Sequence, residues 1–188
     1  LYMRNIVIIS SSVRLARNSH RVALYFKRYL SEHKIANADI VDLNEYKFPL
    51  FDERLRSLPN PAQQVLEFAD KIKNAGGIII VTPEYNGGYP ASLKNVIDLL
   101  YAEWKRKPIA IATVSSGAFG GSQVITSLVF TLWKIGAWVV PSMFPIPKVQ
   151  EAYDAEGAPT DKEGTDKRAK AFVDELVWCM QASEKMKG

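Results

Sequence analysis

Residues 77–90 read Gly-Ile-Ile-Ile-Val-Thr-Pro-Glu-Tyr-Asn-Gly-Gly-Tyr-Pro, an apolar run that stops abruptly at a proline. A short β-branched run without alternation predicts a strand that is buried on both faces. Similar Ile- and Val-rich runs give five expected strands, at 5–10, 39–43, 77–82, 108–114 and 138–140. Apolar residues at helical spacing fill the intervals between the strands and close the chain. This alternation predicts an α/β protein with a mostly parallel sheet and helices on both faces.

The connections between these elements indicate how the sheet is wound. Right-handed crossovers in a five-stranded open sheet favour the doubly wound strand order 2-1-3-4-5. Two proline-containing stretches, 46–61 and 141–164, break the alternation and are expected to be surface excursions. Neither has the length or bias of a domain linker, so residues 1–188 are expected to form one domain.

Composition narrows the class of protein. The 188 residues include 24 basic and 20 acidic side chains, a net charge of +4 without the basic stripe expected of a nucleic-acid-binding protein. The single cysteine, Cys179, excludes an internal disulfide framework, and no Cys/His cluster suggests a metal site. Apolar runs are too short to cross a bilayer. A cytoplasmic enzyme or binding domain, with no nucleic-acid or membrane partner, is the expectation.

The loop after the first strand, residues 10–19, combines hydroxyl groups with two arginines. The N–H groups at the start of the following helix, the hydroxyls of Ser12 and Ser19, and Arg14 or Arg17 could together neutralise a phosphate. The alternative is a solvated helix cap with surface arginines. Neither the nucleoside-triphosphate motif GxxxxGK[ST] nor the dinucleotide motif GxGxxG is present at this turn.

The loop after the third strand combines rigidity with access. Pro83 and Pro90 fix its ends, and Gly87 and Gly88 permit positive φ or close backbone approach. Such a loop, flanked by tyrosines, suits a flat aromatic ligand. A tight turn without a ligand is the alternative.

The loop after the fourth strand, residues 115–122, offers small residues and backbone donors but no acid. Taken alone, its glycines serve turn geometry. The chain has two histidines, His20 and His33, and both are expected at the surface. A phosphate cradle and a flat slot without a strong acid–base residue predict that a cofactor carries the chemistry, with no catalytic side chain.

The segments Pro83-Glu84-Tyr85-Asn86-Gly87 and Ser11-Ser12-Val13-Arg14 resemble those of the NADPH-dependent FMN reductase family, a flavodoxin-like group that includes quinone and chromate reductases and azoreductases. The resemblance covers most of the chain and implies an FMN-binding flavodoxin-like domain. It implies contacts to FMN from Ser12, Arg14, Arg17, Asn18, Ser19, Pro83, Glu84, Tyr85, Asn86, Gly87, Ser115, Ser116, Gly117 and Gly120. Ser11 replaces the usual glycine and Arg17 a frequent serine, so either the turn is expected to be tighter or the phosphate is expected to be held more by charge.

The predicted reaction transfers a hydride from NADH or NADPH to FMN N5, and then electrons to a quinone, flavin, azo compound or metal oxyanion in a ping-pong cycle. Asn86 and the Ser116-Gly117 turn are candidates for donors at the pyrimidine edge. Glu84 has two readings: it holds the loop or a partner subunit, or it contacts substrate. A flavodoxin-like electron carrier and a non-catalytic flavin or nucleotide sensor are the alternative functions.

The remaining expectations concern the surface. The four tryptophans and Phe119 are expected in the core or at an interface. Tyr89 and Tyr101 are expected near the flavin. The apolar surface that these aromatic residues create favours a homodimer, as the resemblance also implies, or a homotetramer. The run 105–107 could meet a nucleotide 2′-phosphate but is better read as a solvated helix end. Cys179 is expected to be an inert buried thiol.

Overall fold

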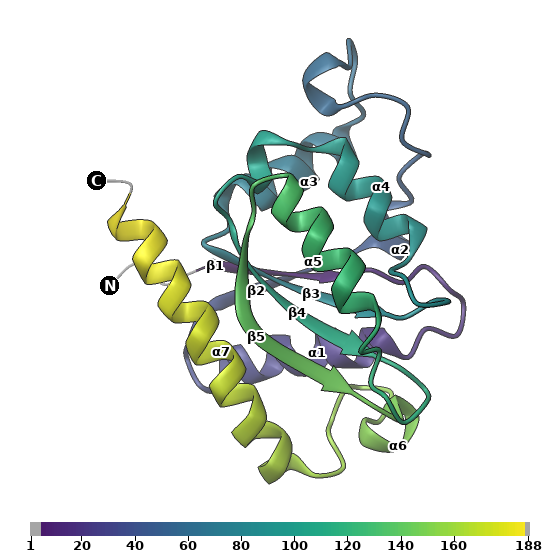
Figure 1. Ribbon diagram of the computed structural model, residues 1–188, viewed down its shortest axis with the longest axis vertical. Helices are drawn as coiled ribbons and strands as arrows, with labels where there is room; N and C mark the ends of the chain where they lie inside the picture. The colour runs from purple at the N-terminus through teal and green to yellow at the C-terminus, as the bar shows by residue number, and fades with distance from the viewer. Residues whose placement is uncertain (1–4, 187–188) are drawn as a thin grey trace.

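The computed structural model describes residues 5–186 and contains one five-stranded parallel sheet with the order β2-β1-β3-β4-β5 (Figure 1). The strands are β1 (Asn5–Ser10), β2 (Asn37–Asp42), β3 (Gly77–Pro83), β4 (Pro108–Val114) and β5 (Trp138–Ile146). The predicted strand order is confirmed. The winding direction reverses between β1 and β3, and ligands of doubly wound sheets bind beside such a point, beyond the carboxyl ends of the strands.

Helices cover both faces of the sheet, with α3, α4 and α5 on one face and α1 and α7 on the other (Figure 1). The long helices are α1 (Ser19–Glu32), α3 (Gln63–Asn74), α4 (Ala91–Leu99), α5 (Val124–Lys134) and α7 (Lys162–Lys185). Ile6 and Ile8 of β1 pack in the core beneath α1 and α7, whereas Val7 and Ile9 pack in the core beneath α3 and α4. Successive strand residues point to opposite faces, so this apolar run fills both cores.

The fifth strand corrects the sequence-based prediction. We expected it to end at Val140 because Pro141 follows, but it continues to Ile146. The register with β4 shifts between Ile109 and Ile111, where β5 carries extra residues, and β5 lies at the edge of the sheet. A bulge on an edge strand accommodates a proline, because its missing N–H costs no hydrogen bond of the ladder.

Short elements complete the chain. They are α2 (Leu43–Tyr46), η1 (Leu55–Ser57), η2 (Ala102–Trp104) and α6 (Val149–Ala152). The stretch 46–61 is largely irregular and lies at the surface, as expected, whereas residues 141–146 of the other expected excursion belong to β5. No helix within residues 5–186 has the length and apolar character needed to cross a membrane.

Candidate functional site

A cavity of about 290 Å³ lies at the carboxyl ends of β1, β3 and β4. Three loops that are distant in sequence form it, as the predicted strand order requires. Eleven of the fourteen predicted cofactor-binding residues line it: Ser12, Arg14, Arg17, Asn18, Ser19, Pro83, Glu84, Tyr85, Ser115, Ser116 and Gly117. Ala16, Val114 and Val149 complete the lining. The wall is therefore rich in hydroxyl groups and cations.

The first loop is anchored to the third strand and to the second loop. The buried Ser11 donates from its hydroxyl to the Val81 carbonyl at 2.9 Å. The Ser12 Oγ and Tyr85 Oη are 2.7 Å apart and share a hydrogen bond. The exposed Arg14 guanidinium lies over the Tyr85 ring, 5.6 Å from its centroid, and no ion pair within residues 5–186 involves Arg14. A cation without a carboxylate partner thus stands at the cavity.

The start of α1 offers donors and an unused hydroxyl. Within the described chain, the N-cap residue Asn18 makes no side-chain capping bond, and the first turn carries no acid. Ser19 Oγ is the one buried side-chain oxygen or nitrogen of residues 5–186 that has no hydrogen-bond partner. Buried polar atoms are nearly always paired, so an orphan in a cavity wall at a helix N-terminus indicates a missing anion. The residues present fit a phosphate group.

Arg17 is held by an acid that sequence reasoning missed. Its guanidinium donates to both carboxylate oxygens of Asp42, the last residue of β2, and Nη1 also donates to the Ser12 carbonyl at 3.1 Å. Asp42 is 3% exposed and also accepts from the Asn44 N–H at 3.0 Å. No local motif joins positions 17 and 42. The strand order was the available signal, because β2 pairs with β1 and ends beside the first loop.

His20 is less exposed than expected, with 26% of its side chain accessible. Its ring is partly buried, with Nδ1 3.0 Å from Ser10 Oγ and 3.6 Å from Asp42 Oδ2. Burial lowers the pKa of His20, an effect that the Asp42 charge only partly opposes. His33 is exposed, as expected.

The second loop contains a tight two-residue turn. Tyr85 and Gly88 exchange backbone hydrogen bonds of 2.8 and 3.0 Å, and Asn86 and Gly87 between them have φ values of +53° and +78°. Positive φ at both central positions is the type I′ geometry that favours Asn-Gly. Asn86 and Gly87 lie outside the cavity lining because they form this turn, which positions Tyr85.

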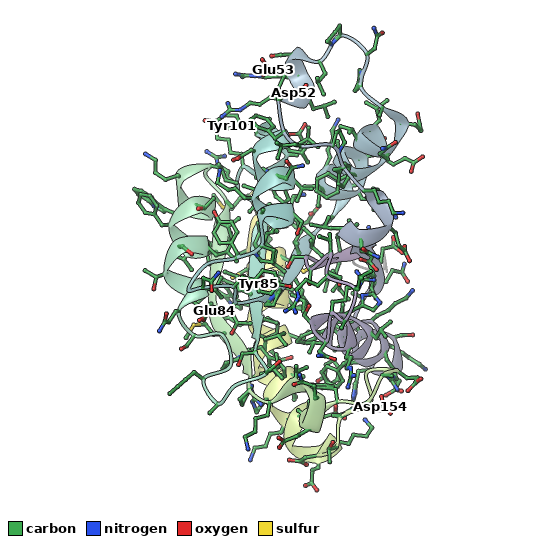
Figure 2. All side chains as sticks on the ribbon, turned by 90° about the vertical axis from the view of Figure 1, so that its right-hand side faces the viewer. Asp52, Glu53, Glu84, Tyr85, Tyr101 and Asp154 are labelled. Atoms are coloured by element: carbon green, nitrogen blue, oxygen red, sulfur yellow. The ribbon has the colours of Figure 1, made fainter. Side chains whose placement is uncertain are left out.

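Glu84 connects the second loop to α5, the helix that follows the third loop. Its Oε2 accepts from the backbone N–H groups of Gln123, at 2.9 Å, and Val124, at 3.3 Å. These groups lie at the N-terminus of α5, where a carboxylate is stabilised by the helix dipole. Of the two readings of Glu84, the structure favours the one in which it holds the loop. Figure 2 places it beside Tyr85.

The third loop is braced by the segment after β5. The Val149 N–H donates to the Ser115 carbonyl at 3.1 Å, and Gln150 Nε2 donates to Ser116 Oγ at 2.8 Å. Gly120, a predicted cofactor contact, lies outside the lining of this cavity. It has a φ of +62°, and a Cβ there would lie 3.1 Å from the Pro145 side chain, so close packing against β5 explains the glycine.

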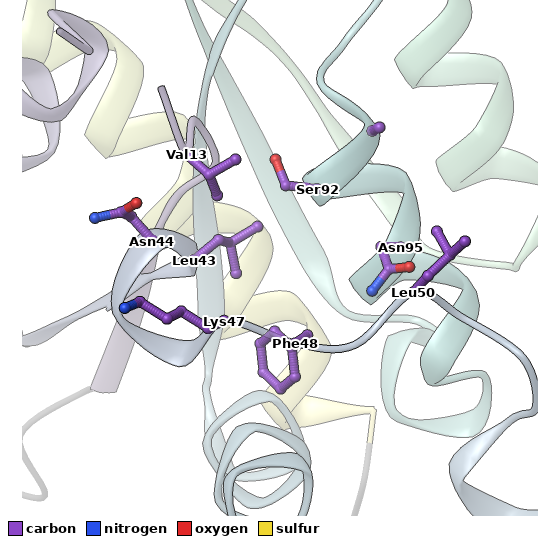
Figure 3. A pocket seen from close by; sticks show the side chains of 9 residues that line it. Val13, Leu43, Asn44, Lys47, Phe48, Leu50, Ser92 and Asn95 are labelled. Carbon is purple, nitrogen blue, oxygen red and sulfur yellow. The ribbon is translucent and has the colours of Figure 1, made fainter. Parts of the chain in front are cut away.

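A second cavity, of about 420 Å³, adjoins the first loop at Val13 (Figure 3). Val13 lines it, whereas its neighbours Ser12 and Arg14 line the polar cavity. Its remaining lining has four apolar residues, Leu43, Phe48, Leu50 and Ala91, and four polar ones, Asn44, Lys47, Ser92 and Asn95. The sequence did not predict this cavity, because residues 46–50 were expected only as the start of a surface excursion.

The structure also shows where Tyr101, Lys107 and Cys179 lie. Tyr101 follows the far end of α4 and lies well away from Tyr85, so it is not near the predicted flavin site (Figure 2). Lys107 is buried, which makes the prediction of a solvated run wrong at that position, although Lys105 and Arg106 are exposed. Cys179 is buried as expected, and burial raises the pKa of its thiol.

Comparisons with known proteins agree with this geometry. Residues 4–151 match the family described as NADPH-dependent FMN reductase. The chain is 42% identical over 129 residues to an NAD(P)H-dependent FMN reductase of Saccharomyces cerevisiae, covering 62% of this chain and 66% of that protein. It is 29% identical to a quinone reductase of Pseudomonas putida, covering 92% of each.

Among solved structures, the fold is similar to that of FerB, a flavoenzyme NAD(P)H:(acceptor) oxidoreductase from Paracoccus denitrificans. The TM-score is 0.77 at 26% identity, covering 96% of this chain and 98% of the other. The likeness therefore includes α7 as well as the residues that match the family.

Proposed function

The chain belongs to the NADPH-dependent FMN reductase family, and on this premise we propose that it is an FMN-dependent oxidoreductase that oxidises NAD(P)H and reduces a small-molecule acceptor. One observation carries the proposal: a buried Ser19 hydroxyl without a partner lines a polar cavity at the N-terminus of α1. An FMN phosphate supplies the acceptor oxygens that this hydroxyl lacks. The fold places this cavity at the winding reversal, where ligands of such sheets bind.

The first loop is the proposed phosphate site. Arg14 brings a positive charge that no carboxylate within residues 5–186 neutralises, and the hydroxyls of Ser12 and Ser19 add neutral donors. The Asn18 side chain does not cap α1, so first-turn N–H groups other than that of Arg21, which donates to the Asn18 carbonyl, are available to an anion. Phosphate binding then replaces the bond that Ser12 now shares with Tyr85.

The second and third loops form the proposed ring site. Pro83, Glu84 and Tyr85 form one part of the cavity wall, and Ser115 to Gly117 form another. Bound FMN supplies the redox chemistry by accepting a hydride and releasing electrons to a second substrate. The chain contributes orientation and N–H donors, and Glu84 fixes the distance between these two parts of the wall through its bonds to the start of α5.

We propose that NAD(P)H and the acceptor react in a ping-pong order. Both substrates reach the flavin ring through the same cavity, so the first product leaves before the second substrate binds. Parallel lines in double-reciprocal plots at several acceptor concentrations test this order. A quinone, a flavin, an azo dye and a metal oxyanion are the acceptors to compare.

A homodimer is proposed from the outer face of α5. Phe130 and Trp133 are 62% and 65% exposed, and their ring centroids lie 5.9 Å apart. With Ile125 and Val129 they form an apolar patch on one helix, and such patches mark protein interfaces. Light scattering of the purified protein tests the oligomeric state, a homotetramer being the other assembly considered. A cytoplasmic location, where NAD(P)H is abundant, is proposed with it and is tested by cell fractionation.

The decisive experiment records the visible spectrum after FMN saturation and desalting, before and after anaerobic NADPH or NADH. Retained flavin bands that bleach with either nucleotide support the reductase. Retained bands that persist with both overturn it in favour of an electron carrier or a sensor. Loss of all flavin on desalting, together with no binding in an FMN titration, overturns the cofactor assignment.

A further inference from the structure

The geometry points to Asp42 as a positioning residue for the phosphate of FMN, acting through Arg17. This inference rests on the proposed function, because it assumes that the first-loop cavity receives the phosphate. Arg17 lines that cavity, whereas Asp42 does not. Asp42 therefore acts on the ligand through the arginine that it holds.

The hydrogen bonds of Arg17 show what Asp42 determines. A guanidinium has five N–H donors in a fixed planar fork. Three of them are used: two on the carboxylate oxygens of Asp42 and one on the Ser12 carbonyl. The two that are left cannot turn independently of the fork. A bidentate carboxylate thus fixes both the plane of Arg17 and the direction of its remaining donors.

Burial makes this arrangement rigid. Asp42 is 3% exposed and the Arg17 side chain 15% exposed, so water competes little for their bonds. The Asn44 N–H also binds Asp42, which ties the carboxylate to the start of α2. His20 is the other titratable group facing Asp42, at 3.6 Å, and its lowered pKa leaves Arg17 as the main cation on this carboxylate at neutral pH.

The same contacts extend to the phosphate loop. Arg17 binds the carbonyl of Ser12, whose hydroxyl lines the cavity, so Asp42, Arg17 and Ser12 form one connected unit from β2 to β1. Without Asp42, Arg17 is free to leave both the loop and the cavity. The effect is then confined to the phosphate half of the cofactor.

The test compares the dissociation constants of FMN and of riboflavin, which lacks the phosphate, by flavin fluorescence. Asp42→Asn is expected to weaken FMN binding about tenfold, through loss of one charge-assisted pair, and to leave riboflavin binding within about twofold. Asp39→Asn is the matched control, because it makes the same substitution on the same strand at a side chain that is 58% exposed. It is expected to change neither the FMN nor the riboflavin dissociation constant.

Two further variants separate positioning from general damage. In the Arg17→Gln background, Asp42→Asn is expected to add nothing, because its effect passes through Arg17. Arg17→Lys retains the charge without the fork and is expected to lose FMN affinity like Asp42→Asn, so it serves where Asp42→Asn does not fold. Equal weakening of both ligands by Asp42→Asn, or an unchanged ratio, overturns the inference. A wild-type protein that binds neither flavin refutes the proposed function instead.

Discussion

Each end of the strands borders a cavity, yet the two ends differ in whether the polar groups beside the cavity find partners within the described protein. At the amino ends of the strands, a cavity of about 590 Å³ adjoins Lys107, whose ammonium donates to the carbonyls of Lys73 and Ala75 at the end of α3. At the carboxyl ends, the cavity of about 290 Å³ holds the unpartnered Ser19 hydroxyl.

Cavity volume alone would favour the amino ends of the strands, whereas the polar groups favour the carboxyl ends. The larger cavity borders a cation that caps a helix from within the protein, which is a structural use of charge. The smaller one borders Arg14 and Ser19, groups whose hydrogen bonds the described protein does not complete. Unsatisfied polar groups, rather than space, indicate a ligand.

The largest expected effect concerns Lys107. Lys107→Met leaves the buried Ala75 carbonyl and the partly buried Lys73 carbonyl without this donor and is expected to lower the free energy of unfolding by about 2 kcal/mol, with the FMN dissociation constant unchanged. Urea denaturation and an FMN titration measure the two quantities. Lys105→Met, at an exposed neighbour, is the control and should change stability by less than about 0.5 kcal/mol. Weaker FMN binding by Lys107→Met would remove the distinction between the edges.

Arg14→Gln is expected to do the opposite of Lys107→Met: it weakens FMN binding and leaves stability unchanged. Removing an exposed cation from the phosphate site is expected to weaken FMN binding about tenfold, the low end for a charge-assisted bond because solvent screens it. Riboflavin affinity and the denaturation midpoint should stay unchanged. The effect should also shrink as salt concentration rises. A loss that is equal for the two flavins contradicts the placement of the phosphate.

Glu84 tests whether a residue at the carboxyl edge can be purely structural. Glu84→Ala removes the acceptor of two N–H groups at the start of α5 and should cost about 1 kcal/mol of stability. Glu84→Gln, which keeps an acceptor oxygen, should cost about half as much. Thermal denaturation measures both. Unchanged stability with a lost rate of NADPH oxidation would assign Glu84 to substrate instead.

Ser19→Ala is expected to weaken FMN binding without lowering the stability of the protein in the absence of FMN. FMN affinity should fall about threefold to fivefold, as for loss of one neutral hydrogen bond. Without FMN, the variant should be at least as stable as the wild type, because it removes a buried hydroxyl that has no partner. A destabilised variant would mean that the Ser19 hydroxyl is satisfied within the protein.

The smallest effect is a pH dependence from His20. Its pKa is lowered from 6.5 by burial, so the unfolded chain binds the proton more readily than the folded one. Stability therefore increases with pH through this window and declines as pH falls below about 6.5. His20→Gln should flatten that decline in urea titrations between pH 7 and pH 5. An unchanged slope would show that His20 does not contribute.

Much of this site follows from the sequence because its parts are local. The Pro83 to Gly87 segment and the serines after β1 each carry their own turn chemistry, and the strand order predicted from the alternation of elements places them together. The structure also explains why Asn86 and Gly87 belong to a turn rather than to the cavity wall.

What the sequence did not predict depends on non-local pairing. Asp42 meets Arg17 only because β2 lies beside β1, and no spacing rule relates the two positions. In the sequence, Lys107 is indistinguishable from its exposed basic neighbours Lys105 and Arg106. Only the fold brings the end of α3 next to its ammonium group. Pro141 reads as a strand terminator unless β5 is known to be an edge strand with a bulge. In each case the deciding neighbour is distant in sequence.

The central claim is that the phosphate of FMN occupies the cavity at the carboxyl edge. A crystal structure of the protein with FMN tests it most directly. Phosphate oxygens are expected at hydrogen-bond distance, about 2.6–3.2 Å, from Ser19 Oγ and from the first N–H groups of α1. A phosphate bound elsewhere, with the Ser19 hydroxyl still unpartnered, would contradict it.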